Sequence, residues 1–138
     1  MFTTVPFKSV PGLDKPVSEV MHRGVIALPA TATLADVAST MRDDEVHAVL
    51  VTGTDGGHLG WVTSGGMLRN HGRDWTVAAS AADAITQPAA SVAPTATLAD
   101  AMNVFIATGA SHILVGAGAG EAPIGVLADS NLVAFMAQ

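Results

Sequence analysis

Five histidines are the residues of this chain that first suggest a metal site or an acid–base catalyst: His22, His47, His58, His71 and His112. No two of them lie at a short, zinc-like spacing together with carboxylates on one helical face. A nucleophilic triad is a second type of chemistry to consider, but the chain has no nucleophile-elbow sequence. The absence of cysteine excludes thiolate metal sites, disulfides and cysteine nucleophiles. The histidines are therefore predicted to have surface or packing roles.

A glycine-rich run, GAGAG at Gly116–Gly120, is the motif that most resembles a phosphate-binding loop. Glycines let a backbone approach a phosphate closely, as in dinucleotide-binding loops. Such a loop must open a helix after its strand, whereas residues 124–128 have the apolar pattern of another strand. A similar run, GTDGG at Gly53–Gly57, also lies between two apolar stretches. Both runs are therefore predicted to be turns between neighbouring strands.

The two glycine runs belong to a repeat that extends through the chain. The hexapeptide TATLAD occurs at Thr31–Asp36 and again at Thr95–Asp100. An apolar triplet follows each copy at the same distance, Val49–Val51 in the first and Ile113–Val115 in the second. A unit of roughly 60 residues is too small to bury a secure core alone. We therefore expect the two copies to pack face to face as one domain with pseudo-twofold symmetry.

Each copy predicts the same order of elements: strand, helix, strand, strand, helix. The second threonine of TATLAD can cap the free amides of a helix, and the aspartate three residues later completes a capping box. Apolar residues at helical spacing follow each box, and short apolar runs predict the strands. The fold class is therefore predicted to be α/β (α+β). The predicted strands are residues 24–28, 48–52, 59–63, 90–93, 112–116 and 124–128, and the predicted closing helices are 67–70 and 131–136.

Length and charge limit the organisation and the partners of the chain. Its 138 residues predict an N-terminal arm at 1–15, a first repeat at 16–72, a connection at 73–80 and a second repeat at 81–138. The net charge of -6 disfavours nucleic acid and anionic membranes as partners. No stretch approaches the ~18 unbroken apolar residues of a membrane-spanning helix. Because the start also lacks the build of a secretory signal, we expect a cytoplasmic protein.

The pieces of the repeat, taken in order, resemble a pair of cystathionine beta-synthase (CBS) domains. The first copy contains SEVM, GVIALPATATLADV, EVHAVLV and GWVTSGGML, and the second contains DAIT, SVAPTATLADAM, GASHILV and GVLADSNL. The resemblance covers about residues 16–136 and implies a tandem pair, often called a Bateman module. It also implies a regulatory, non-enzymatic module that binds AMP, ADP, ATP or S-adenosylmethionine in clefts between the two copies.

The resemblance further implies how such a ligand is held. In the family, the segment after the last strand often reads Gly, two apolar residues, Thr or Ser, two variable residues, and Asp. The hydroxyl and the carboxylate hold phosphate and ribose. The first copy keeps Thr63 but has Gly66 in place of Asp, and the second copy has Ala128 and Asn131 in place of the hydroxyl and Asp. An asparagine can bond ribose, less strongly than an ionised acceptor.

By the same resemblance, each cleft takes residues from both copies. One cleft is expected to join Thr63, Ser64, Gly66, Val92, Ala110 and Ser111. The opposite cleft is expected to join Ser130, Asn131, Ile26, Val46 and His47. His47 is open to two interpretations, a phosphate contact or a polar side chain at the entrance of a strand.

Two functions follow from the resemblance. The first is a regulatory module that senses an adenosine-type nucleotide, needs no resident cofactor and forms a homodimer through its helices. The second is a ligand-free dimerisation or protein-interaction module with degenerate clefts, which Gly66 and Ala128 favour. An enzyme is not expected, because titratable groups are not clustered in the sequence. The sequence does not identify the ligand or the regulated partner.

Overall fold

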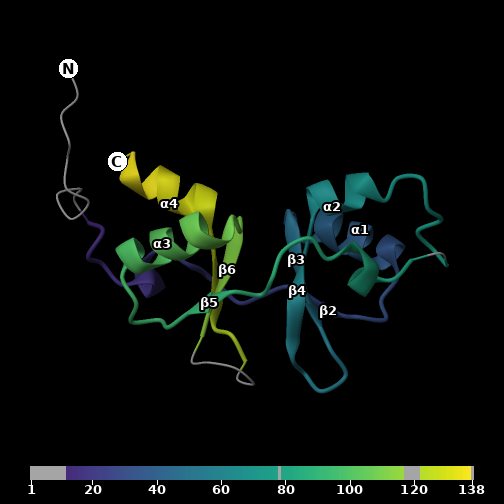
Figure 1. The fold of residues 1–138 in the computed structure, drawn as a ribbon, viewed down its shortest axis with the longest axis horizontal. Coiled ribbons are helices and arrows are strands. Elements are labelled where there is room, and N and C mark those ends of the chain that lie inside the picture. Colours follow the sequence, from purple (N-terminus) through teal and green to yellow (C-terminus); the bar gives the residue numbers. More distant parts are fainter. Residues whose placement is uncertain (1–11, 78, 117–121, 138) are drawn as a thin grey trace. The chain divides into compact units, whose positions relative to one another are not determined.

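The computed structural model describes residues 12–77, 79–116 and 122–137 (Figure 1). These residues form two compact units. The first-copy unit contains residues 25–89, and the second-copy unit contains the described residues up to 24 together with those from 90 onward. Both units contain the order strand, helix, strand, strand, helix, which confirms the predicted mixed α/β fold with two repeated halves. Residues 117–120 of the GAGAG run lie outside the described residues.

A three-stranded sheet in the order β2-β3-β4 forms the first-copy unit. Its elements are β2 (Ala27–Pro29), α1 (Leu34–Asp43), β3 (Ala48–Thr52), β4 (His58–Thr63), α2 (Ser64–Arg69) and the 3-10 helix η3 (Ala81–Ala84). β2 and β3 are parallel because α1 crosses between them, whereas β3 and β4 form an antiparallel hairpin. The hairpin turn is closed by a hydrogen bond from the Gly53 amide to the Gly57 carbonyl (2.8 Å), which confirms the predicted turn.

A four-stranded sheet in the order β1-β7-β6-β5 forms the second-copy unit. Its elements are η2 (Val17–Glu19), β1 (His22–Arg23), β5 (Ser91–Val92), α3 (Leu98–Thr108), β6 (His112–Val115), β7 (Gly125–Ala128) and α4 (Asp129–Met136). β5 and β6 are parallel, and the other two pairs are antiparallel. In each unit the helices gather on one face of the sheet (Figure 1).

The two TATLAD sequences begin α1 and α3 with the predicted capping boxes. Thr33 Oγ1 accepts a hydrogen bond from the Asp36 amide (3.0 Å), and Asp36 Oδ2 accepts one from the Thr33 amide (3.1 Å). Thr97 and Asp100 form the same pair of bonds at 3.1 and 3.0 Å. Each box satisfies two amides that the helix itself leaves without partners. The sequence repeat is thus a repeat of helix starts.

The apolar stripes of α1 and α3 cover the sheets. In the first-copy unit, Leu34 and Val37 are fully buried against the strand valines Val49, Val51 and Val62. In the second-copy unit, the corresponding set is Leu98, Ala101, Phe105, Ile113, Val115 and Leu127. Small and branched side chains dominate both cores, as the composition requires.

The segment that opens each copy in the sequence packs with the sheet of the other copy. Residues 17–23 open the first copy, but their strand β1 pairs with β7 of the second-copy unit. Residues 81–87 open the second copy, but Gln87 forms a bridge with Trp61 of β4. We call these two stretches the opening segments. The compact units therefore have boundaries different from those of the repeats read from the sequence.

Two glycines allow these opening segments to approach so closely. A Cβ on Gly60 would lie 2.6 Å from both the Gln87 carbonyl oxygen and Ile85 Cγ2. A Cβ on Gly125, at the corresponding place in β7, would overlap the His22 carbonyl oxygen. Any larger residue at either position would push the opening segment away from its strand. Glycine at these two corresponding positions of the last strands is therefore required by the fold.

The structure differs from the predicted boundaries in three places. Residues 12–15, predicted to belong to a terminal arm, pack on α3: Leu13 is 2% exposed, and the Leu13 carbonyl accepts from the Ala99 amide (2.9 Å). The closing helices begin directly after the last strands, at Ser64 and Asp129, three and two residues earlier than predicted. The first strand is Ala27–Pro29, shifted from residues 24–28 because it pairs with Leu50–Thr52, at the end of β3.

Membrane insertion through a helix is not supported by the part of the chain that the structure describes. None of the helices there combines the length and the apolar character needed to cross a bilayer.

The residue with a left-handed backbone just after the first long helix of each copy is a glycine in one copy and a glutamate in the other. Gly109 follows α3 with φ 68°, the left-handed conformation in which helices commonly end at glycine. Glu45, at the corresponding position after α1, is held at φ 54°. A side chain with a Cβ is disfavoured there by roughly 1–2 kcal/mol. The first copy is therefore strained at the end of α1, and the second copy is not.

Replacing Glu45 by glycine tests this strain. We expect Glu45→Gly to stabilise the protein by about 0.5–1 kcal/mol, because relief of the left-handed penalty exceeds the entropy lost by glycine. Asp44→Gly is the matched control: Asp44 has φ −96°, so glycine there should only destabilise. Urea unfolding measures both. Equal loss of stability in the two variants would contradict the assignment of strain to Glu45.

Candidate functional site

Five of the eleven predicted ligand-binding residues lie at two turns, where a strand of each sheet runs directly into a closing helix. The Thr63 junction comprises Thr63–Gly66, between β4 and α2, and the Ala128 junction comprises Ala128–Asn131, between β7 and α4. In both, the residue that ends the strand is also the N-cap residue of the helix. The two junctions therefore place corresponding residues on the same local backbone.

Two threonine hydroxyls lie side by side at the Thr63 junction. Thr63 Oγ1 accepts a hydrogen bond from the Gly66 amide (3.2 Å) and lies 3.3 Å from Thr86 Oγ1. Thr86 belongs to the opening segment of residues 81–87, and its backbone is fixed by the bond from its amide to the Trp61 carbonyl (3.0 Å). Thr63 is half-buried and Thr86 is exposed. The pair therefore presents two neighbouring hydroxyl groups to solvent.

Ser64 and His47 meet at the same junction, as the strand entrance of β3 lies beside the end of β4. The Ser64 amide donates to the His47 carbonyl (3.0 Å), and the Ser64 hydroxyl donates to the same oxygen (3.4 Å). The His47 side chain is exposed. The structure thus brings together within one unit two residues that the resemblance assigned to opposite clefts.

Gly66 is buried at the position where the family pattern has aspartate. A Cβ on Gly66 would lie 2.9 Å from the Ala84 carbonyl oxygen and 3.1 Å from Thr86 Cγ2. A carboxylate at this position would have to displace the opening segment. The packing of residues 84–86 against Gly66 therefore leaves no room for the family's aspartate.

The Ala128 junction has different side chains on a similar backbone. Asn131 Oδ1 accepts from the Ala128 amide (3.0 Å), a bond in the opposite direction to the one from the Gly66 amide to the Thr63 hydroxyl. The Asp129 amide donates to the Ser111 carbonyl (2.9 Å), which corresponds to the bond between Ser64 and His47. Asp129 and Ser130 are exposed, and Asn131 is half-buried.

The other predicted residues serve the strands in their own units. In the first-copy unit, the Ile26 carbonyl accepts from the Leu50 amide (3.0 Å), and Val46 is half-buried beside His47. In the second-copy unit, Val92 pairs with Val115, and Ala110 is 4% exposed. Because each predicted cleft draws residues from both units, the composition of the clefts remains a prediction.

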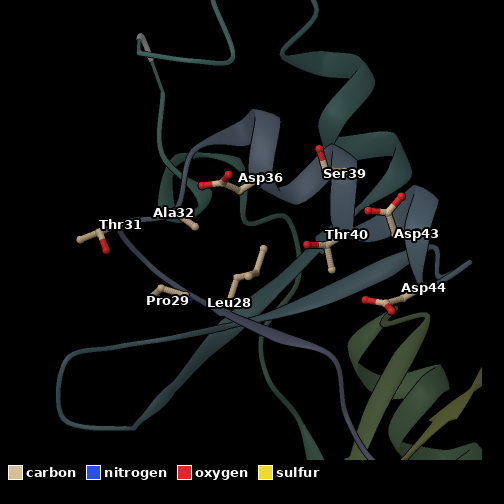
Figure 2. Close-up of a pocket in the computed structure, with 9 residues that line it drawn as sticks. All are labelled: Leu28, Pro29, Thr31, Ala32, Asp36, Ser39, Thr40, Asp43 and Asp44. Carbon is tan, nitrogen blue, oxygen red and sulfur yellow. The ribbon is translucent and has the colours of Figure 1, made fainter.

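A groove of about 560 Å³ lies between α1 and β2 in the first-copy unit (Figure 2). The residues that line the groove are Leu28, Pro29, Thr31, Ala32, Asp36, Ser39, Thr40, Asp43 and Asp44. None of them is a predicted site residue. Figure 2 shows the three carboxylates spread along the groove without converging on one point. The hydrogen bond from the Arg42 guanidinium (2.8 Å) and its positive charge lower the pKa of Asp43. An acidic groove of this kind does not suit a phosphate-bearing ligand.

The described residues contain no group of three or more His, Cys, Asp or Glu side chains that could hold a metal ion. The remaining perturbed carboxyls, those of Asp74 and Asp83, have lowered pKa values because neighbouring Thr76 and Ser80 donate hydrogen bonds to them. Both are exposed turn or cap residues. The polar side chains of the junctions are the hydroxyls of Thr63, Ser64 and Ser130, the amide of Asn131 and the carboxylate of Asp129. All of them can take part in hydrogen bonds.

A family model for the CBS domain matches the chain twice, at residues 17–71 and 81–138. The chain belongs to the CBS-domain family. It carries two CBS domains in tandem, as the order of the sequence pieces predicts. A search of curated proteins finds no match to this chain.

Solved structures share the fold of the CBS pair at low sequence identity. An uncharacterised conserved protein from Pyrococcus horikoshii is 15% identical, with a TM-score of 0.75 over 91% of this chain and 95% of that chain. A CBS-domain protein from Agrobacterium tumefaciens is 19% identical, with a TM-score of 0.73 over 95% of this chain and 98% of that chain. CBSX2 in complex with AMP is 17% identical, with a TM-score of 0.72 over 90% of this chain and 97% of that chain.

Thr86 is a junction residue that the sequence analysis did not single out. It ends the DAIT piece, which opens the second copy in sequence, whereas the hydroxyl that it meets belongs to the first. The one available signal was the alignment of DAIT with SEVM, which places threonine where the first copy has Met21. That alignment does not reveal that each opening segment pairs with the sheet of the other copy.

Restoring the family's aspartate at position 66 should lower the stability of the folded protein. We expect Gly66→Asp to destabilise the protein by about 1–3 kcal/mol, because the new side chain overpacks Ala84 and Thr86. Gly65→Asp is the matched control, since Gly65 is exposed and its Cβ would meet only Thr63 Oγ1, at 3.8 Å. Thermal unfolding compares the two. A Gly66→Asp protein as stable as Gly65→Asp would contradict the packing argument.

Proposed function

We propose that this CBS pair is a non-catalytic regulatory module that binds an adenosine nucleotide, with the phosphate held at the Thr63 junction. The observation that carries the proposal is the pair of hydroxyls on Thr63 and Thr86, 3.3 Å apart. The AMP complex of CBSX2, which shares this fold, supports the choice of ligand class.

The hydrogen bonds at the junction leave donors for an anion. Thr63 Oγ1 already accepts from the Gly66 amide, so the Thr63 hydroxyl proton remains to be donated, either to Thr86 or to a ligand. The exposed Thr86 hydroxyl can rotate to donate beside it. Residues 63–66 carry no carboxylate that would repel a phosphate. Two adjacent donors can therefore each reach a phosphate oxygen.

The same junction limits how the ribose is held. A carboxylate can accept from both ribose hydroxyls, but Gly66 supplies none and leaves no space for one. Hydrogen bonds to charged groups contribute about 1.5–3 kcal/mol each. We therefore expect weaker affinity than a CBS pair with the full family pattern would give.

Removal of the Thr63 hydroxyl tests the proposal. We expect Thr63→Ala to weaken AMP binding at least tenfold in isothermal titration, because about 1.5–3 kcal/mol is typical of a hydrogen bond to a charged group. Thr63→Ser keeps the hydroxyl and should retain binding. Thr33→Ala removes a corresponding N-cap hydroxyl from α1 in the same unit and controls for the loss of a cap. Unchanged AMP affinity in Thr63→Ala, or absence of AMP binding by the native protein, would overturn the proposal.

A second candidate function, self-association without a ligand, is favoured by the closing helices. Leu68 of α2 is 70% exposed, and Val133 at the same position of α4 is 66% exposed. Matching apolar positions on the two helices are the type of surface that a homodimer covers. In this alternative, the buried Gly66 and the apolar Ala128 mark clefts that no longer bind a ligand.

Charged substitutions on these helices test self-association. We expect the double variant Leu68→Glu, Val133→Glu to shift a dimer toward monomer in sedimentation velocity, because unpaired carboxylates are costly to bury. Ile106→Glu on α3, where the isoleucine is 74% exposed, is the matched control and should remain dimeric. A native protein that sediments as a monomer at high micromolar concentration would rule the alternative out.

A further inference from the structure

The two junctions can be compared residue by residue because their backbones form the same bonds. The amide of the first helical residue donates to a strand-entrance carbonyl in each: Ser64 to His47 at 3.0 Å, and Asp129 to Ser111 at 2.9 Å. Asp129 therefore occupies the position of Ser64, and Ala128 that of Thr63. Corresponding residues can then be compared for their chemistry.

The opening segments extend the correspondence to a third residue. Thr86 directly precedes Gln87, which bridges Trp61 of β4. Met21 directly precedes His22, which pairs with Val126 of β7. Met21 therefore takes the place of Thr86, and it packs against Gly125, where a Cβ would lie 2.7 Å from the Met21 sulfur.

At all three positions the second copy lacks the hydrogen-bond donor that a phosphate oxygen requires. The two threonine hydroxyls are replaced by the methyl group of Ala128 and the thioether of Met21, and neither side chain is a hydrogen-bond donor. The Ser64 hydroxyl is replaced by the exposed carboxylate of Asp129. A like charge within a few ångströms of a phosphate disfavours the bound state.

We propose that Asp129 is a specificity-determining residue that excludes phosphate from the Ala128 junction, so that phosphate-bearing nucleotides bind at the Thr63 junction alone. This inference rests on the proposed nucleotide-binding function and adds a difference between its two sites. An ionised Asp129 only accepts hydrogen bonds, so it suits hydroxyl or ammonium donors rather than the oxygens of a phosphate.

Transplanting the first copy's residues into the second tests the inference. Isothermal titration with AMP should give one site per chain in the native protein and two in the double variant Ala128→Thr, Asp129→Ser. Asp14→Ser, which removes an exposed carboxylate from the same unit, is the control for net charge and should keep one site. In the double variant, adding Thr63→Ala should leave only the newly built site. Circular dichroism melts confirm that each variant is folded.

The outcomes separate this inference from the function on which it rests. Two AMP sites in the native protein, or one unchanged site in the double variant, would overturn the role of Asp129 while leaving nucleotide binding intact. No AMP binding by the native protein would instead overturn the proposed function. In that case a single new AMP site in the double variant would still support the role of Asp129, and no site would overturn it as well.

Discussion

The pairing of each opening segment with the last strand of the other copy's sheet is the contact on which the two junctions depend. At β4 the Trp61 amide donates to the Gln87 carbonyl (2.9 Å) and the Thr86 amide donates to the Trp61 carbonyl (3.0 Å). Gly60 permits this approach because it has no Cβ. This pairing places Thr86 next to Thr63, although the two residues belong to different copies and lie far apart in the sequence.

The same contact explains why the copies diverge in chemistry and yet keep one backbone. Gly60 and Gly125 are both glycines, because each must admit a peptide backbone at close range. Threonine and methionine can exchange at positions 86 and 21, because the bonds that hold the opening segments come from the main chain. Backbone pairing thus conserves the shape of a junction while leaving its side chains free to differ. Aspartate at position 66 is the exception, because that side chain would point into the packed opening segment.

The sequence predicted the local features well because they depend on neighbouring residues. The capping boxes of Thr33 and Thr97, the paired apolar strands and the turn at Gly53–Gly57 each follow from spacing within a few residues. Features that depend on distant contacts were missed: the strand β1, the burial of Leu13, and Thr86 as a neighbour of Thr63. The positive φ of Glu45 was also missed, since glutamate gives no local signal for the left-handed conformation. The assignment of residues to clefts remains a prediction.

Amide hydrogen exchange at Thr86 tests the central claim most directly, because its amide proton is bonded only if the opening segment pairs with β4. We predict that the amides of Thr86 and Trp61 exchange as slowly as those within the β3–β4 hairpin. Exchange of the Thr86 amide at the rate of an unstructured peptide, with the hairpin still protected, would contradict it. In that case Thr63 and Thr86 would not form a shared site.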